Sequence, residues 1–331
     1  MIITRTPYRI SFFGGGSDYP DWYLKNGGEI ISSTIDKFVY ISSRDLPKFF
    51  SHNYRVSYSL VEETKNISGI KHKVVREILK KYKLKKGLEI HYDGDLPSKS
   101  GMGSSSAFIV GLLHNLNIFL NNKISKKKLA LKSLYFEQKI LKELVGSQDQ
   151  IACAYGGFNS IQFLKNGSFK IKNYNYKKNF LKNINNELYL VYTEQQRNSQ
   201  KIVKNFIYDL NIKKEKQIYK IIEYAEIAKK YLLNNSHQEF CEMIADSWNI
   251  KKSIHKSISN KKLDDFYNYS VSNGAEGGKL LGAGGGGFLQ LYVPIDNQVS
   301  VKKALSNLLH VPFAFESNGS KIILNDPHKK V

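Results

Sequence analysis

A turn rich in glycine and serine, between a strand and a buried helix, constrains this chain more than any other segment. The expected strand is Leu-Glu-Ile-His-Tyr at 88–92, and apolar residues recur at helical spacing from Ala107 to Leu116. Successive backbone N–H groups at a helix start can cradle phosphate, and serine hydroxyls can bond phosphate oxygens or the shell of a Mg²⁺ ion. The candidate phosphate-binding residues are Ser98, Lys99, Ser100, Gly101, Met102, Gly103, Ser104, Ser105 and Ser106.

This turn is not a Walker A loop, because it has no Gly-Lys-Ser or Gly-Lys-Thr at the required spacing. The alternative is a flexible linker in which a serine caps the helix that follows. The strand before the turn and the helix after it favour the phosphate cradle.

A second candidate stretch lies near the start of the chain, at residues 6–19, where glycines follow an apolar strand. Glycines let the backbone come close to a ligand, while Arg9 supplies a fixed cation and Asp18 an acceptor for hydroxyl groups. A tight turn with a surface arginine and a capping aspartate explains the same pattern. The candidate substrate-binding residues here are Gly14, Gly15, Gly16, Ser17 and Asp18.

Two further stretches add glycines and carboxylates. Residues 281–288 place five glycines before a strand, which predicts close approach of backbone to backbone or to a ligand, with Gly284 and Gly285 as candidates. A flexible hairpin loop is the alternative. Glu137 and Asp149 can divide labour, one holding a divalent metal and the other taking or orienting a hydroxyl proton. Taken alone, Glu137 reads as a solvated helix charge.

The order of expected elements predicts an α+β protein of two domains, at residues 1–186 and 187–331. A run of strands opens the chain, including Phe-Val-Tyr-Ile at 38–41, and a helical stripe follows at 74–82. After a strand at 188–192 we expect amphipathic helices over 199–272, a strand at 288–293 and a last helix near 300–309. The boundary rests on the polar tract Lys-Asn-Phe-Leu-Lys-Asn-Ile-Asn-Asn alone.

Charge and hydropathy limit the kinds of partner the protein can bind, and the cysteine count limits its disulfides. The formal net charge of +21 fits a site for anionic small molecules, but the lysines are scattered, as on a solvated surface, and no nucleic-acid-binding motif accompanies them. No apolar run predicts a membrane span or a signal peptide, so we expect a cytoplasmic protein without membrane partners. Cys153 and Cys241 are too few for a disulfide framework and are expected to be reduced, buried and inert.

Taken together, these motifs resemble those of the GHMP kinases, the family of galactokinase, homoserine, mevalonate and phosphomevalonate kinases, over nearly the full length. Pro-Tyr-Arg-Ile-Ser-Phe-Phe-Gly-Gly-Gly-Ser-Asp resembles the first family motif, Gly-Met-Gly-Ser-Ser-Ser-Ala the second, and Gly-Ala-Gly-Gly-Gly-Gly-Phe the third. The resemblance implies an N-terminal domain like domain 2 of ribosomal protein S5, a ferredoxin-like C-terminal domain, ATP and Mg²⁺ as cofactors, and a small-molecule acceptor; it allows a homodimer.

Carried over position by position, the resemblance assigns Asp149 as the catalytic aspartate, Arg9 as the basic residue beside it, and Ser105 with Glu137 as Mg²⁺ ligands. The Gly-Gly-Gly-Ser-Asp form of the first motif is similar to that of kinases of D-glycero-D-manno-heptose 7-phosphate. This implies phosphorylation of the anomeric hydroxyl to the 1,7-bisphosphate, a precursor step toward GDP-heptose and cell-surface polysaccharide. Arg197 is a candidate cation for the sugar phosphate, or else a solvated surface arginine.

Three other readings stay open at this stage. The chain could phosphorylate an unphosphorylated sugar, as fucokinases and galactokinases do. It could be a sugar and ATP sensor without turnover, although the retained site residues argue against that. A nucleic-acid-binding protein on an S5-like fold is the third, and it lacks the paired aromatic and basic strands that such a site needs.

Overall fold

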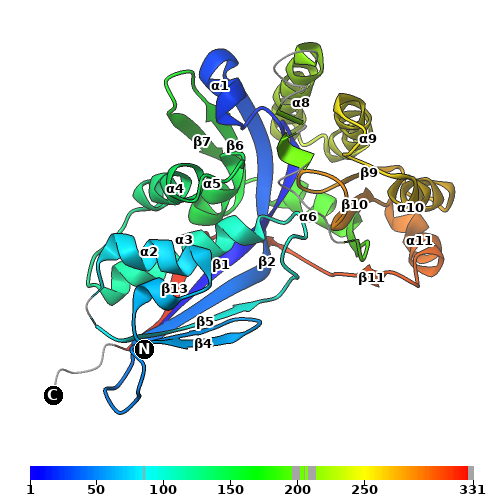
Figure 1. Cartoon of the computed structure of the whole chain (residues 1–331). Helices are drawn as coiled ribbons and strands as arrows, with labels where there is room; N and C mark the ends of the chain where they lie inside the picture. Colours follow the sequence, from blue (N-terminus) through cyan, green and yellow to red (C-terminus); the bar gives the residue numbers. More distant parts are fainter. Residues whose placement is uncertain (85, 196–201, 205, 208–213, 327–331) are drawn as a thin grey trace.

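The computed structural model describes residues 1–84, 86–195, 202–204, 206–207 and 214–326. Within these residues the strands form a sheet of nine strands and a sheet of four, and helices pack against both (Figure 1). Most strand pairs are antiparallel, and the helices are grouped rather than alternating strictly with strands. The predicted α+β class is confirmed.

The large sheet is built around β2 (Gly28–Asp45). This strand contains the predicted strand at 38–41 and extends beyond it at both ends. One edge of β2 pairs with β1 (Ile2–Phe13), and its other edge is shared by β6, β12 and β5 in turn. The other strands of this sheet are β3 (Tyr54–Ser57), β4 (Val61–Thr64), β5 (Leu88–Gly94), β6 (Phe158–Phe163), β7 (Phe169–Asn173), β12 (Phe315–Glu316) and β13 (Lys321–Asn325).

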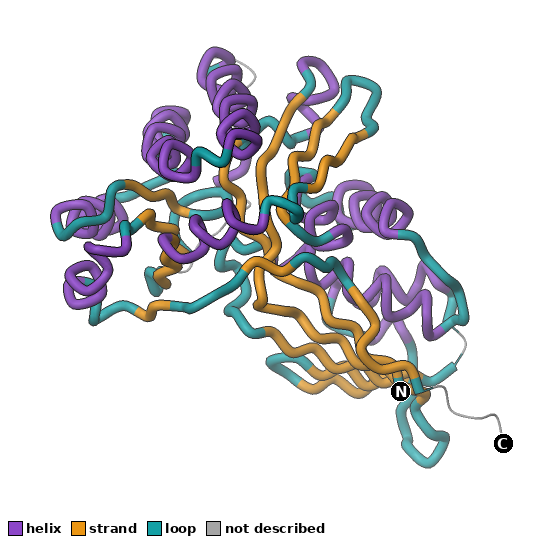
Figure 2. The backbone as a smooth tube through the Cα atoms, turned by 180° about the vertical axis from the view of Figure 1, so that it is seen from behind, coloured by secondary structure: helices purple, strands orange, loops and turns teal. Residues whose placement is uncertain are grey.

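The central helix α3 (Ser104–Phe119) lies on β1 and β2 and is buried around most of its circumference. The predicted stripe at 74–82 forms α2 (Lys73–Tyr82), whose Val75, Ile78 and Leu79 are buried at helical spacing. Figure 2 shows the strands of the large sheet from behind, with helices packed beside them. The remaining helices of this part are α1 (Pro20–Asn26), α4 (Lys126–Tyr135), α5 (Gln148–Tyr155) and the short turns η1 (Ile67–Gly69) and η2 (Phe136–Ile140).

The small sheet has the strand order β11, β8, β10, β9. The predicted strands at 188–192 and 288–293 are found as β8 and β10. The last helix ends at Ala304 instead of 309, and β11 begins at Leu309, inside the span predicted as helix. The elements are β8 (Leu188–Tyr192), β9 (Gly277–Leu280), β10 (Phe288–Tyr292) and β11 (Leu309–His310), with α6 (Lys178–Glu187), α8 (Glu215–Asn234), α9 (His237–Ile254), α10 (Lys261–Ser272), η3 (Ile295–Asn297) and α11 (Gln298–Ala304).

The chain returns to the large sheet at its end. β12 pairs with β2 and β13 pairs with β1, so that Asn325 lies opposite Ile2. The rings of Phe12 and Phe240 lie 5.4 Å apart at their centroids, which joins the core of the large sheet to α9. The domain boundary after residue 186 stays a prediction. Two strands from beyond that boundary, β12 and β13, belong to the large sheet.

Both cysteines are free and buried, as expected, and burial raises the pKa of each thiol above its ordinary value. A thiol that resists ionisation is a weak nucleophile. Among the helices of the described residues, none is long and apolar enough to cross a membrane.

Candidate active site

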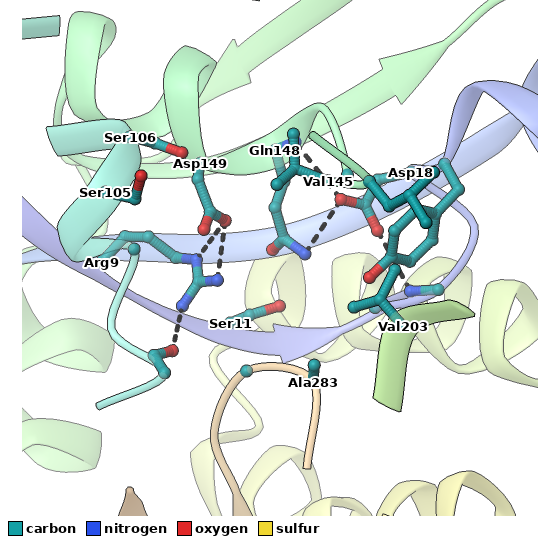
Figure 3. Close-up of a pocket in the computed structure, with 18 of the residues that line it drawn as sticks. Arg9, Ser11, Asp18, Ser105, Ser106, Val145, Gln148, Asp149, Val203 and Ala283 are labelled. Carbon is teal, nitrogen blue, oxygen red and sulfur yellow. Dashed lines mark hydrogen bonds and ion pairs between the residues drawn. The ribbon is translucent and has the colours of Figure 1, made fainter. Parts of the chain in front are cut away.

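A cavity of about 190 Å³ lies where the candidate segments meet. Its wall is drawn from the first stretch (Arg9 to Tyr19), the serine turn (Lys99 to Ser106), the segment from Glu137 to Asp149, and Gly282 with Ala283 from the third glycine stretch. Figure 3 shows side chains from these segments converging on one space. Segments that are far apart in sequence therefore share a single site.

Arg9 and Asp149 form an ion pair in this wall. Arg9 lies on β1 and Asp149 in the first turn of α5, and both the Nε and Nη2 atoms of Arg9 lie 2.7 Å from Asp149 Oδ1 (Figure 3). Arg9 Nη1 also donates to the carbonyl of Gly101 at 2.8 Å. The planar guanidinium thus fixes Asp149 against the serine turn, a geometry that a lysine ammonium cannot reproduce.

Asp18 is buried farther along the same wall, with Gln148 between it and Asp149 (Figure 3). Its Oδ1 accepts a hydrogen bond from the Gly16 backbone at 3.1 Å, and its Oδ2 accepts from the backbone and side chain of Gln148. Burial raises the pKa of Asp18, and nearby Asp149 adds to the shift. At Gly146 a Cβ would lie 1.9 Å from Asp18 Oδ2, so only glycine lets this carboxylate occupy its position.

The serine turn contributes Lys99, Gly101, Gly103 and Ser104 to Ser106 to the wall, and α3 begins at Ser104. Gly103 has a φ of +76°, and a Cβ there would lie 3.2 Å from Asp149 Oδ2. The turn therefore needs glycine to approach the Arg9 and Asp149 pair. Ser98, Ser100 and Met102 do not line the cavity; Met102 is fully buried, and the carbonyl of Ser100 accepts from the Phe288 backbone.

Glu137 is fully buried in η2, a π-helical turn directly after α4. Ser106 Oγ donates to both carboxylate oxygens at 3.0 and 2.9 Å, and the side chain of Gln150 donates to Oε2. Burial raises the pKa of Glu137 to about 8, although these hydrogen bonds act in the opposite direction. The neighbour that bonds Glu137 is thus Ser106, while Ser105 is exposed in the cavity wall.

The donor set at this end of the cavity fits a magnesium ion carried by a phosphate ligand. Among the described residues no group of three or more His, Cys, Asp or Glu side chains could hold a metal. Magnesium in phosphoryl-transfer sites is commonly held by one or two protein oxygens together with substrate phosphates and water. Glu137 and the hydroxyl of Ser105, both lining the cavity beside the serine turn, supply donors of that kind.

The third glycine stretch brings its backbone close to other backbone, which is one of the two possibilities predicted for it, and Gly284 and Gly285 lie outside the cavity lining. A Cβ at Gly284 would lie 2.6 Å from the carbonyl oxygen of Ile258, and the backbone N–H of Gly285 donates a hydrogen bond to that same carbonyl. At Gly287 a Cβ would lie 2.1 Å from the carbonyl of Ser100. The glycines let this stretch pack its backbone against the serine turn, so only Gly282 and Ala283 reach the cavity.

The first glycine stretch divides in the same way. Gly15 and Gly16 line the cavity, whereas Gly14 packs against the carbonyl of Glu29 and Ser17 Oγ donates to the carbonyls of Gly14 and Glu29. Gly14 and Ser17 therefore shape the turn that presents Gly15, Gly16 and Asp18. Arg197 lies outside the described residues.

Several residues in the cavity wall or bonded to it were not assigned a role from the sequence. Gln148 and Gln150 flank Asp149 and were visible in the same short stretch, but only the structure shows that they bond to Asp18 and Glu137. Lys251 and Lys279 also line the cavity. No sequence signal distinguished these lysines from the scattered surface lysines, and Ser11 looked like an ordinary strand residue.

Comparisons with known proteins find a matching domain family, similar sequences and similar folds. Residues 70–157 match the family described as "GHMP kinases N terminal domain". The D-glycero-alpha-D-manno-heptose 7-phosphate kinase of Campylobacter jejuni is 27% identical over 317 residues, which cover 92% of this chain and 93% of that protein. A galactokinase of Pyrococcus furiosus is 30% identical over 170 residues, covering 49% of this chain and 46% of that protein.

Solved structures share the fold over almost the whole chain. The crystal structure of a D-glycero-D-manno-heptose 1-phosphate kinase from Bacteroides thetaiotaomicron superposes with a TM-score of 0.81 at 22% identity, covering 99% of this chain and all of that one. A galactokinase from Lactococcus lactis complexed with galactose has a TM-score of 0.75 at 16% identity, covering 97% and 94%. At these identities the likeness is one of fold, and it extends through both sheets.

Proposed function

We propose, from the premise that this chain belongs to the GHMP kinases, that it is an ATP-dependent kinase of a heptose phosphate. The acceptor is D-glycero-D-manno-heptose 7-phosphate, and the γ-phosphoryl group of ATP passes to its anomeric hydroxyl to give the 1,7-bisphosphate. ATP as the donor also implies a cytoplasmic protein. The choice of sugar is supported by the similarity to the Campylobacter jejuni kinase over 92% of the chain.

The observation that carries the kinase assignment is the Arg9 and Asp149 pair beside the serine turn. Both contacting nitrogens of Arg9 engage Oδ1, and within the described part of the chain Oδ2 of Asp149 makes no hydrogen bond. An acceptor hydroxyl can bond to that oxygen while the serine turn holds the donor phosphates. Nucleophile and phosphoryl group would then meet in line over a short distance.

In this arrangement the hydroxyl oxygen attacks the γ-phosphorus, the bond to ADP breaks, and the hydroxyl proton passes to Asp149. The transition state of phosphoryl transfer is loose, so positioning and stabilisation of charge contribute more than proton removal. Backbone N–H groups of the serine turn and the N-terminus of α3, which line the cavity, would bind the phosphate oxygens. Arg9 keeps Asp149 oriented throughout.

Magnesium would be held by Glu137 and Ser105 together with the nucleotide phosphates. The ion would supply neutralisation of charge on the phosphate oxygens. Glu137 is held by Ser106 and Gln150, and because its pKa is about 8 it must release a proton when a cation binds beside it. The sugar itself would lie toward Asp18, whose carboxylate accepts hydrogen bonds and whose neighbours Gly15 and Gly16 leave space for a ring.

The names of two relatives differ in the position of the phosphate. The Campylobacter jejuni protein is named a heptose 7-phosphate kinase, and the Bacteroides thetaiotaomicron protein is named a heptose 1-phosphate kinase.

A coupled ADP-release assay with Mg·ATP tests the proposed reaction directly. The panel contains D-glycero-D-manno-heptose 7-phosphate, the corresponding 1-phosphate, the free heptose, sedoheptulose 7-phosphate, mannose, fucose and galactose. Selective turnover of the 7-phosphate is the expected result, and Asp149→Asn is the control for contaminating kinases.

Turnover of only a free sugar would keep the kinase chemistry and reject the phosphorylated acceptor. Turnover of the 1-phosphate would reject the anomeric hydroxyl as the acceptor group. If no sugar stimulates ADP release, the kinase assignment itself fails.

A further inference from the structure

A lysine is buried in the wall of the active-site cavity. Lys279 lies on β9, is 4% exposed and lines the cavity, and its Nζ donates to the carbonyl of Phe12 at 2.6 Å. Lysine side chains are seldom fully buried unless a carboxylate or another anion compensates the charge. The environment of Lys279 therefore shows whether the protein supplies that anion itself.

Within the described residues, no carboxylate forms an ion pair with Lys279. The charged groups that act on it are Lys251 and Arg9, and burial together with these two cations holds the pKa of Lys279 well below its ordinary value. A ligand carrying negative charge would reverse that effect by favouring the ammonium form.

The carboxylates of the cavity are already engaged by other groups. Asp149 accepts from Arg9, Asp18 accepts from the Gly16 backbone and Gln148, and Glu137 accepts from Ser106 and Gln150. Burying an ammonium without an anion is costly, so a lysine kept in the cavity wall without a carboxylate partner points to an anionic ligand that restores its charge.

A second polar group in the wall of the same cavity makes no hydrogen bond within the described part of the chain. Ser11 lines the cavity, is 6% exposed, and its buried Oγ makes no hydrogen bond to any described residue. Ser11 directly precedes Phe12, whose carbonyl holds Lys279, and it lies two residues after Arg9 on β1, where side chains share a face of the strand. Figure 3 shows Arg9 and Ser11 on this strand facing the cavity.

We propose that Lys279 and Ser11 bind a phosphate group of the reactants, a step that rests on the proposed kinase function. An ammonium and a hydroxyl donor in the wall of one cavity match the oxygens of a phosphate. Two sources share this chemistry: the phosphate already on the acceptor sugar and the phosphoryl group in transfer. A purely structural role for Lys279, tying β9 to β1 through the Phe12 carbonyl, is the alternative that the experiment must separate.

Inorganic phosphate is the first probe, because it does not depend on knowing the sugar. Thermal unfolding of the full chain is followed over a phosphate titration, with and without saturating Mg·ADP to occupy the serine turn. Lys279→Met should weaken the apparent phosphate affinity by about 10-fold or more, and Ser11→Ala by about 2- to 10-fold. Lys262→Met, which removes an exposed lysine on α10, is the matched control and should leave phosphate binding unchanged.

Unchanged phosphate affinity in Lys279→Met and Ser11→Ala would overturn the inference and leave Lys279 as a structural tie. If Lys279→Met does not fold, Ser11→Ala decides, since it leaves the bond between Lys279 and Phe12 in place. Both variants are measured against the wild-type chain in the same buffer, with sodium chloride of equal ionic strength as the blank.

Kinetics then identify the source of the phosphate. If Lys279 binds the acceptor phosphate, Lys279→Met raises KM for the heptose 7-phosphate by about 10-fold or more and changes kcat little. If it binds the group in transfer, kcat falls by about 10-fold or more and KM changes little. Unchanged KM and kcat would reject the inference while the kinase function stands. Absence of turnover by the wild-type chain would reject the function, and the phosphate titration would still decide the role of Lys279.

Discussion

Both Nε and Nη2 of Arg9 lie 2.7 Å from the same oxygen of Asp149, Oδ1. Arg9 therefore contacts the carboxylate at one oxygen only. Its third guanidinium nitrogen, Nη1, donates a hydrogen bond to the carbonyl of Gly101 in the serine turn. Arg9 thus ties Asp149 on α5 to the serine turn, which the proposed function makes the acceptor and donor sides of the cavity. Substitutions at Asp149 and at Arg9 therefore test the two partners separately.

Asp149→Asn should lower kcat by about 10²- to 10⁴-fold, the range that a positioned general base contributes. The amide keeps an oxygen for Arg9 but cannot take the hydroxyl proton. ATP affinity, measured by titration calorimetry, should change little because the serine turn is intact. A kcat near that of the wild-type chain would remove Asp149 from the reaction.

Arg9→Lys should lower kcat/KM by about 10-fold or more, because one ammonium cannot replace the fork that contacts Asp149 and Gly101. Steady-state kinetics give this value. The matched control is Arg5→Lys on the same strand, where the arginine pairs with Glu316 away from the cavity. Equal effects of the two substitutions would mean that the Arg9 geometry has no special role.

Glu137→Gln should change how stability depends on pH. The folded pKa of about 8 lies above the ordinary value of 4.5, so between these limits the unfolded chain loses a proton that the folded chain retains. Glu137 therefore favours folding at low pH, and that contribution is lost as the pH rises toward 8. Glutamine does not titrate, so the variant should gain stability relative to wild type between pH 5 and pH 8.

Urea unfolding at pH 5, 6.5 and 8 measures this difference. Glu239→Gln removes a carboxylate from an exposed position on α9 and serves as the control for net charge. Parallel pH profiles for wild type and Glu137→Gln would contradict the assignment of a raised pKa to Glu137.

Gly287→Ala should separate the third glycine stretch from the serine turn. Gly287 has a φ of +105°, and its Cβ would lie 2.1 Å from the carbonyl of Ser100. Gly167→Ala is a matched control, because Gly167 has a φ of +81° but its Cβ would meet its nearest neighbour at an ordinary 3.6 Å. The control should lose about 1–2 kcal/mol of unfolding free energy from backbone strain alone.

Gly287→Ala should lose more than the control and should also bind ATP more weakly, since the backbone of Ser100 must move. Chemical denaturation and nucleotide titration on both variants provide the comparison. Equal losses in the two variants would mean that the close approach of the two stretches has no energetic weight.

Much of the fold was predictable where the spacing of apolar residues within one segment indicates that segment's own helix or strand. The stripe at 74–82 gave α2, and the apolar runs at 188 and 288 gave β8 and β10. The return of β12 and β13 to the large sheet was not predictable, because short strands in the last part of the chain carry no mark of which distant strand they pair with. The partition of β2 among several partners depends on the whole sheet in the same way.

The site was predictable where the glycine and serine motifs carry chemistry in a short stretch. The residues that line the cavity from these motifs include Arg9, Asp18, Asp149 and the serine turn. Which glycines pack against backbone and which face the ligand depends on contacts with distant segments, such as that between Gly284 and Ile258. Lys279 could not be recognised because burial, not residue type, distinguishes it from the other lysines.

The most direct measurement is the structure of the product. The chain is incubated with Mg·ATP and D-glycero-D-manno-heptose 7-phosphate, and the product is examined by phosphorus and proton nuclear magnetic resonance. A second sugar-phosphate resonance coupled to the anomeric proton, formed in step with ADP, is the expected result. ADP release without a new sugar phosphate, or a new phosphate coupled to any other proton of the sugar, would contradict the proposed reaction.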